Sequence, residues 1–156
     1  MLKIANNEDG EAIFNLTANA GVFKSTEIKI LEELWSDYIK SGSEESGYYF
    51  IVFRENGKIL GYACYGPHPL TDATFDLFWI AVDKESQGKG VGQALLNKTE
   101  KDVKDLGGYL IVIETSSLDH YSQARRFYTA AGYTFEARIQ DFYGPGDDIV
   151  YFTKHV

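Results

Sequence analysis

A run of alternating glycines separates two segments of different character near the middle of the chain. The sequence QGKGVG at positions 87–92 follows the apolar run TFDLFWIAV, which ends at Val82, and precedes a helical pattern that begins at Val91 and stops at Gly107. A second strand of the buried type, Tyr109 to Glu114, comes next. Two buried strands joined through a helix need a crossover connection, which favours parallel pairing.

The other segments predict a mixed sheet rather than a fully parallel one. Residues 48–54 and 58–65 are β-rich runs separated by Asn56-Gly57, the strongest short hairpin signal, so we expect them to pair antiparallel. The further expected elements are a strand over 1–5, a helix over 9–19, a helix from 25 or 26 to a loop at 41–47, a strand over 74–82, a helix over 122–131, and strands over 134–142 and 149–154. We therefore predict a single α/β domain, residues 1–156, built on a mixed sheet whose N-terminal strands are mostly antiparallel.

Composition and charge exclude several classes of function. The formal net charge is -8 and the basic residues form no stripe, which argues against a nucleic-acid partner. No segment has the ~18 consecutive apolar residues of a membrane span, and the N-terminus MLKIANNEDG lacks the apolar core of a signal peptide. We expect a cytoplasmic protein that binds neither nucleic acid nor membrane.

Cysteine and histidine offer little chemistry by their spacing. Cys64 is the single cysteine and sits in the apolar run ILGYACYG, so it is expected to be a buried filler rather than a nucleophile. The histidines at 68, 120 and 155 are scattered and show no metal-ligand spacing. The sequence therefore predicts no metal site.

The glycine segment is placed to bind an anion. Amide groups at a helix N-terminus lack intrahelical acceptors, and the helix dipole adds partial positive charge. Glycines at 88, 90 and 92 let the main chain curl around oxygens, and Lys89 adds charge at the rim. Taken alone, the segment is equally compatible with a simple turn into a helix. It matches neither the Walker pattern nor the dinucleotide fingerprint, so a nicotinamide-dependent oxidoreductase fails on glycine spacing.

The segment does match the acyl-CoA motif Gln/Arg-x-x-Gly-x-Gly/Ala, through Gln87, Gly90 and Gly92. With the strand ending IAV before it and the stretch FYTAAGY at 127–133 after it, the sequence resembles the GNAT superfamily of acyl-CoA-dependent N-acyltransferases over nearly its whole length. The resemblance implies two central strands that splay apart, with the pantetheine arm of acetyl-CoA or another acyl-CoA in the gap and no metal. The cofactor-binding residues it implies are Ile80, Ala81 and Val82 for the pantetheine, and Gln87, Gly88, Lys89, Gly90, Val91 and Gly92 for the pyrophosphate.

The resemblance also suggests catalytic residues. Tyr128 stands where the family places a tyrosine near the sulfur that commonly serves as general acid, although a tyrosine on a helix face is ordinarily a packing residue. Glu114, at the end of its strand, and Asp76, within a buried-type run, are the two candidates for the general base, and a water chain is a third alternative. Many relatives carry an asparagine that touches the cofactor seven residues before the tyrosine, whereas this chain has Tyr121.

The expected function is transfer of an acyl group, with acetyl foremost, from acyl-CoA to a primary amine of a small molecule or peptide by direct attack in a ternary complex. The alternative is a catalytically inactive module that binds or senses acyl-CoA. The sequence does not determine the oligomeric state, and a homodimer is one of the alternatives. Surplus acids are compatible with a cationic acceptor or with a merely solvated surface: Glu44, Glu45, Asp72, Asp141, Asp147 and Asp148.

Overall fold

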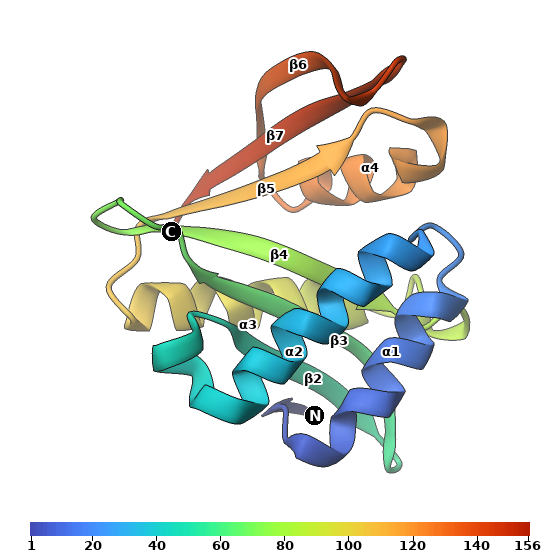
Figure 1. The fold of residues 1–156 in the computed structure, drawn as a ribbon, viewed down its shortest axis with the longest axis vertical. Helices are drawn as coiled ribbons and strands as arrows, with labels where there is room; N and C mark the ends of the chain where they lie inside the picture. Colours follow the sequence, from blue (N-terminus) through green and yellow to red (C-terminus); the bar gives the residue numbers. More distant parts are fainter.

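The protein is built on one mixed sheet with helices on both faces. A computed structural model describes residues 1–156. Seven strands lie in the order β1-β2-β3-β4-β5-β7-β6, and only β4 and β5 pair in parallel (Figure 1). The strands are β1 (Leu2–Ile4), β2 (Tyr49–Glu55), β3 (Lys58–Pro67), β4 (Thr74–Val82), β5 (Leu110–Ser116), β6 (Thr134–Gly144) and β7 (Asp147–His155). The helices are α1 (Gly10–Asn19), α2 (Ser25–Ser46), α3 (Val91–Asp105) and α4 (Ser122–Ala130), with 3-10 turns η1 (Asn7–Asp9), η2 (Lys84–Ser86) and η3 (Asp119–Tyr121). The predicted α/β fold is confirmed.

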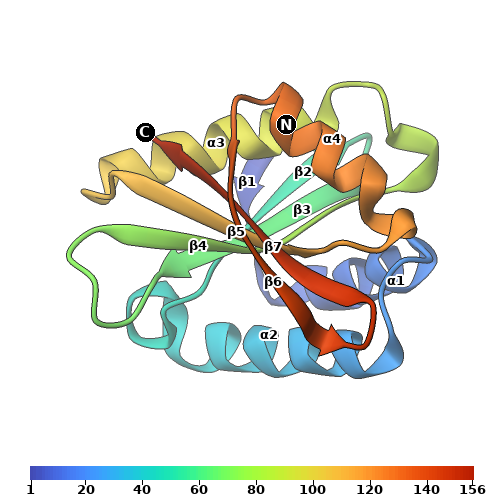
Figure 2. The same ribbon diagram turned by 90° about the horizontal axis from the view of Figure 1, so that it is seen from above.

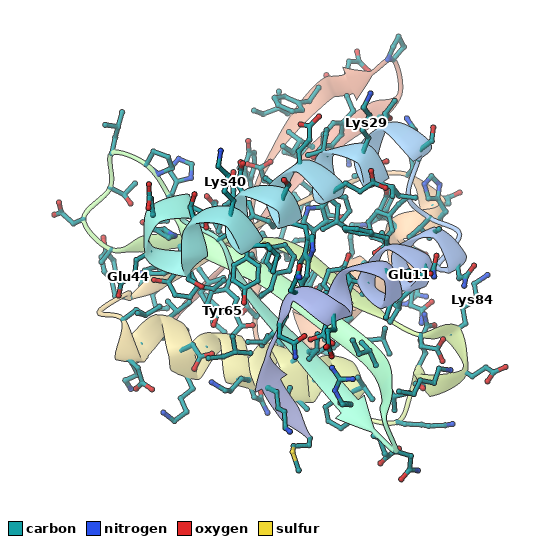
Figure 3. The ribbon with its side chains drawn as sticks, turned by 60° about the horizontal axis from the view of Figure 1, so that its bottom comes forward. Glu11, Lys29, Lys40, Glu44, Tyr65 and Lys84 are labelled. Carbon is teal, nitrogen blue, oxygen red and sulfur yellow. The ribbon has the colours of Figure 1, made fainter.

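The helices form two layers. Figure 2 shows α1 and α2 on one side of the sheet and α3 and α4 on the other. Strand β3 accordingly buries both faces: Tyr62 and Cys64 pack toward α1 and α2, whereas Ala63 and Tyr65 pack toward α3. The Tyr65 hydroxyl donates to the carboxylate of Asp102 on α3 at 2.7 Å, and its side chain lies between the sheet and that helix in Figure 3. Burial on both faces explains why this part of the sequence is nearly continuous in apolar residues.

The parallel pair β4–β5 is short, because the two strands separate after a few residues. Pairing joins Thr74–Asp76 to Leu110–Val112 and goes no further. Just beyond this point β4 contains a β-bulge: Tyr65 of β3 opposes Leu77 and Cys64 opposes Trp79, so Phe78 has no partner. A bulge bends its strand and increases the local twist.

Beyond Asp76, β4 follows β3 while β5 follows β7, and the two strands diverge (Figure 1). We call the facing edges of residues 77–82 in β4 and 113–116 in β5 the fork. No ladder joins these edges to each other. Backbone groups of both strands therefore line the fork without a partner strand, which is the splayed pair that the family resemblance implied.

Most observed boundaries lie within two residues of the expected ones, and the differences in α2 and β5 have an identifiable cause. The segment 41–47, expected to be a loop, is helical on both sides of Gly42, whose φ of 78° and ψ of 173° interrupt α2. Glycine adopts this conformation without strain, so the helix resumes and ends only at Gly47. Strand β5 runs past Glu114 to Ser116 because it stays paired with β7, so Glu114 lies within a strand rather than at its end. None of the helices is long and apolar enough to cross a membrane.

The C-terminal end of α2 lies directly against the sheet. A Cβ atom built on Gly66 of β3 would lie 1.8 Å from the carbonyl oxygen of Gly47, the residue that ends α2. Both of these atoms belong to the backbone or are fixed to it, so a side chain at position 66 can be accommodated only if the helix end moves. Gly66 thus fixes how closely α2 approaches β3.

We expect Gly66→Ala to lower the free energy of unfolding by about 3 kcal/mol, because the methyl group forces the backbone of the helix end away from the strand. Thermal and urea unfolding of the two proteins would measure the loss. Gly144→Ala is the matched control, since a Cβ there meets no atom within 4 Å and its φ is not positive. Equal stability of the two variants would show that the contact of α2 with β3 is not constrained at this position.

Candidate active site at the fork

The first turn of α3 presents a row of free backbone donors. The first amide in this region with a helical acceptor is that of Ala94, which donates to the Gly90 carbonyl at 3.0 Å. The amides of residues 88–93 donate to no protein group, and Gly90 at the N-cap supplies no side chain. Helix α3 is fifteen residues long, so its dipole adds partial positive charge at the same point. This turn has the geometry and the charge of an anion-binding site.

The three glycines of the turn have different physical roles. Gly88 and Gly90 have φ values of 74° and 84°, a region that other residues enter only at a cost, and a Cβ on either would meet no atom. Gly92 instead allows close packing, since its Cβ would lie 3.2 Å from the Phe127 ring of α4. The absence of a side chain at position 92 therefore also makes room for α4, while the Gly92 amide, like those of Gly88 and Gly90, donates to no protein group.

The predicted cofactor residues lie along one continuous path from the fork to α3. Ile80, Ala81 and Val82 belong to the part of β4 that borders the fork. The Gln87 side chain does not point away from the protein: its Nε2 donates to the Val82 carbonyl at 3.4 Å, and its Oε1 accepts from Gln123 of α4 at 3.3 Å. Gln87 therefore ties the glycine turn to the end of β4 and to α4. Lys89 is exposed and forms no ion pair.

We call the point where the pairing of β4 with β5 ends, at Asp76 and Val112, the vertex of the fork. Tyr128 is buried next to this vertex, yet its hydroxyl has no protein partner. Its side chain is only 7% exposed, and its ring packs against Phe152 of β7, which opposes Ile113, the first β5 residue beyond the parallel pairing. No hydrogen bond reaches the hydroxyl, which nevertheless keeps contact with solvent. Burial raises the pKa of Tyr128 well above the usual value, so the phenol stays protonated and able to donate.

Thr115 of β5 is a second buried residue whose hydroxyl has no protein partner and keeps contact with solvent. It is 8% exposed, lies on the same face as Ile113 because strand side chains alternate, and its Oγ1 makes no hydrogen bond. Nothing in its sequence context distinguished it, because threonine is common in strands. Two unpaired hydroxyls on the α3–α4 side of the fork are available to a bound molecule.

The two predicted base candidates lie together on the opposite face of the same vertex. Asp76, opposite Val112, is the last residue of β4 that pairs with β5, and Glu114 is two positions further along β5 on the same face. Desolvation raises the pKa of Glu114, and the charge of Asp76 raises it further. Desolvation also raises the pKa of Asp76, against the opposing effect of His68. Glu114 accepts no hydrogen bond from the protein, so its carboxylate is free to take a proton.

His68 belongs to this group, although its spacing in the sequence gave no signal. Its Nδ1 lies 2.7 Å from the Asp76 carboxylate. His68 lies between Pro67 and Pro69 in the β3–β4 loop, which by sequence looked only like a strand terminator. Its proximity to Asp76 depends on the antiparallel return of β4 along β3, which brings residues 68 and 76 together.

Further carboxylates continue from Glu114 toward α2. Desolvation, then Glu114, and then Tyr151, Asp147 and Glu27 raise the pKa of Tyr143 to about 12. We call the surface formed by Glu27, Asp76, Glu114 and Asp147 the acidic face. No lysine or arginine pairs with any of its members.

Other surplus acids have structural roles. Asp148 is buried and ion-paired with Arg138, whereas Asp147, beside it in the sequence, accepts from the Ser116 hydroxyl at the acidic face. Tyr121, which replaces the asparagine of many relatives, donates to the Val22 carbonyl at 3.1 Å and so ties η3 to the loop between α1 and α2. The sequence could not separate these roles, because they depend on contacts between distant segments.

Comparison with known proteins agrees with this geometry. The family model described as "Acetyltransferase (GNAT) family" matches residues 13–133. A protein from Desulfovibrio desulfuricans assigned to the GNAT family of acetyltransferases is 35% identical, with 99% of this chain and 98% of that chain covered and a TM-score of 0.95. An aminoglycoside 6'-N-acetyltransferase solved with coenzyme A shares the fold at 15% identity, with 99% and 96% covered and a TM-score of 0.79.

Human N-acetyltransferase 8B is 32% identical over 88 residues, which are 53% of this chain and 38% of that protein. The chain thus spans little more than a third of the length of this curated relative. The family match covers most of the chain and includes the glycine turn, the fork and Tyr128. The chain belongs to the GNAT family of acetyltransferases.

Proposed function

We propose that this protein transfers an acyl group, with acetyl foremost, from acyl-CoA to a primary amine by direct attack at the fork. One observation carries the proposal: the free amides of residues 88–93 lie at the end of a strand whose edge is open back to Asp76. The diphosphate of coenzyme A suits the amides, because they offer donors and partial positive charge together. The resemblance in fold to an acetyltransferase solved with coenzyme A supports the same assignment.

The pantetheine arm fits the open edge of β4. Residues 77–82 span about 17 Å at the usual rise per residue. The arm is an extended chain with two amide groups, and an extended chain can pair with an unpartnered strand edge through its main-chain groups. In this arrangement the diphosphate lies at Gly88–Gly92 and the thioester lies at the vertex, between Tyr128 and the carboxylates of Asp76 and Glu114.

The chemistry divides between the two faces of the vertex. Glu114 takes a proton from the ammonium form of the acceptor, because only a neutral amine attacks a carbonyl. The amine nitrogen then forms a bond to the acyl carbon, and the carbon–sulfur bond breaks. Tyr128 donates its proton to the departing sulfur, and the proton lost by the new amide nitrogen restores it. Acid and base act from opposite sides of the sheet, so neither obstructs the other.

The acidic face favours an acceptor that carries positive charge. Four carboxylates without a lysine or arginine partner create a negative potential that attracts ammonium groups to the open side of the fork. A primary amine of a small molecule or of a peptide satisfies this requirement. Release of free thiol from acetyl-CoA against a panel of such amines tests the proposal directly. Saturable binding of acetyl-CoA without turnover on any amine would instead support a sensing module.

We expect Gly90→Ala to weaken coenzyme A binding by about tenfold, because alanine at φ 84° costs roughly 1–2 kcal/mol and shifts the amides of the turn. Isothermal titration calorimetry with coenzyme A measures the change. Gly107→Ala is the matched control: its φ is 86°, its Cβ also meets no atom, and it lies just beyond the opposite end of α3. Equal losses of affinity in both variants would mean that the effect is only general destabilisation.

We expect Tyr128→Phe to lower kcat by about 100-fold with little change in KM for acetyl-CoA, because the departing sulfur loses its proton donor while the aromatic packing remains. Steady-state kinetics at saturating acceptor would show this. Tyr133→Phe removes a buried hydroxyl from the same cluster, one that donates to Glu100 at 3.2 Å, and should leave kcat unchanged. Full activity of Tyr128→Phe would remove the tyrosine from the mechanism.

The pH profile should show Glu114 acting as a base. A carboxylate accepts a proton only when ionised, so activity is present above its pKa and lost as the pH falls through it. Partial desolvation raises the pKa of Glu114, so we expect this loss to begin at a higher pH than for a fully solvated glutamate. Glu114→Gln should abolish the acid limb of kcat/KM and most of the activity. Glu55→Gln, at the exposed end of β2, should change neither. An unaltered acid limb in Glu114→Gln would assign the base elsewhere.

A further inference from the structure

His68 and Asp76 form a histidine–carboxylate pair that the chemistry above does not use. The two side chains are joined at 2.7 Å between Nδ1 and the carboxylate oxygen. The imidazole is 48% exposed, whereas the Asp76 side chain is 13% exposed. The pair therefore leads from the half-buried vertex of the fork to bulk water.

The loop holds the imidazole in place through its backbone. The His68 amide donates to the Thr74 carbonyl at 2.8 Å, and the His68 carbonyl accepts from the Thr71 hydroxyl at 2.8 Å. Prolines at 67 and 69 restrict the backbone on either side. These restraints fix the backbone at His68, and with it the position from which the imidazole reaches Asp76.

Acyl transfer to an amine must release a proton. An ammonium acceptor and a thioester become an amide and a thiol, so the acceptor nitrogen loses two protons and the sulfur gains one. The first proton lost by the nitrogen goes to Glu114, and the second returns to Tyr128 after Tyr128 has protonated the sulfur. Glu114 must then lose its proton to water before the next turnover.

Bound substrates would block the direct route from Glu114 to water. The coenzyme along β4 and the acceptor on the acidic face would together cover the vertex on its open side. His68 lies beyond the paired ends of β4 and β5, and the coenzyme site at the start of α3 lies at the other end of the molecule (Figure 1). The imidazole therefore stays in contact with water when the fork is filled.

We propose, on the basis of the function proposed above, that Asp76 and His68 carry the proton released at Glu114 out to solvent. The three groups lie in sequence: Asp76 pairs with Val112, two residues before Glu114 on the same face of the sheet, and Asp76 bonds His68 directly. Tyr151 of β7 also faces the two carboxylates, and Asp72 is the other ionisable group of the loop. Imidazole exchanges protons with water near neutral pH, which suits it to this last step.

The test combines a conservative substitution with chemical rescue. In dilute buffer at pH 7 we expect His68→Ala and His68→Gln each to lower kcat about tenfold for the best primary amine of the panel, without changing KM for acetyl-CoA. A glutamine at position 68 can still donate a hydrogen bond to Asp76 but cannot take up and release a proton. A loss of kcat in this variant therefore reports the loss of proton transfer and not the loss of the contact. Added imidazole should restore kcat of His68→Ala in proportion to its concentration, and tetramethylammonium chloride at equal ionic strength should not.

His155→Ala is the matched control, because His155 is also an exposed histidine but stacks on Tyr109 at the far end of β7. It should keep full activity and show no response to imidazole. Wild-type kcat in both His68 variants, or a loss that imidazole does not restore, would overturn the relay. No turnover by the wild-type protein on any amine would instead overturn the proposed function.

A second measurement needs no substrate and keeps the two failures distinct. At fixed pH, the NMR signals of the His68 imidazole should shift in Asp76→Asn and in Glu114→Gln relative to the wild type, because each variant removes a negative charge close to the ring. Both shifts together would support the chain of interacting groups. Unchanged His68 signals in Glu114→Gln would break the link between the base and the histidine.

Discussion

The early end of the pairing between β4 and β5 is the constraint on which the site depends. A parallel ladder continued to the ends of both strands would satisfy their backbone groups and leave no room for a ligand. The bulge at Phe78 turns β4 along β3, while β5 keeps its full register with β7. Each of the two central strands thereby stays paired on its outer side, β4 with β3 and β5 with β7, while the sheet is open between them. The resulting strand edges can be completed by a molecule that carries its own amide groups, as the pantetheine arm does.

The alternation of side chains along a strand then assigns the chemistry to two sides. Ile113 and Thr115 face α3 and α4, where Tyr128 lies, and Glu114 between them faces the acidic side. A shift of β5 by one residue relative to β7 would exchange these faces and place the carboxylate in the apolar core. The same register that buries Ile113 therefore also positions Glu114, the proposed base. Packing and the proposed catalysis depend on a single alignment of strands.

Most of the fold could be predicted from the sequence because it follows from local patterns. Hydrophobic periodicity, the Asn56-Gly57 turn and the crossover helix were sufficient for the mixed sheet and its parallel pair. Boundaries that depend on a single backbone conformation were not predictable: Gly42 interrupts α2 but does not end it. The glycine turn was recognised, yet the different role of Gly92 depends on Phe127, which is distant in the sequence.

The site was predictable only where a motif or a strand position marked it. Tyr128, Glu114 and Asp76 were identified in this way, and the structure brings them to one vertex. His68 and Thr115 were missed for a physical reason. His68 matters because its partner, Asp76, comes from another part of the chain, and Thr115 matters because its hydroxyl has no partner. Neither property can be inferred from the residues next to them in the sequence. Resemblance to a family helps least at such positions, because it describes what relatives share.

The acidic residues with structural roles differ from those at the candidate site in the partners of their carboxylates. Asp148 is buried, accepts from the Asp141 amide and pairs with Arg138, and these partners lower its pKa. Glu100 likewise pairs with Lys154. Asp76 and Glu114 instead lose water without gaining a full cationic partner, and their pKa values rise. At neutral pH such groups destabilise the folded state, since their ionised form is favoured more in the unfolded chain. Unpaired carboxylates, free hydroxyls and free amides occur together around the fork, where a substrate would supply the missing partners.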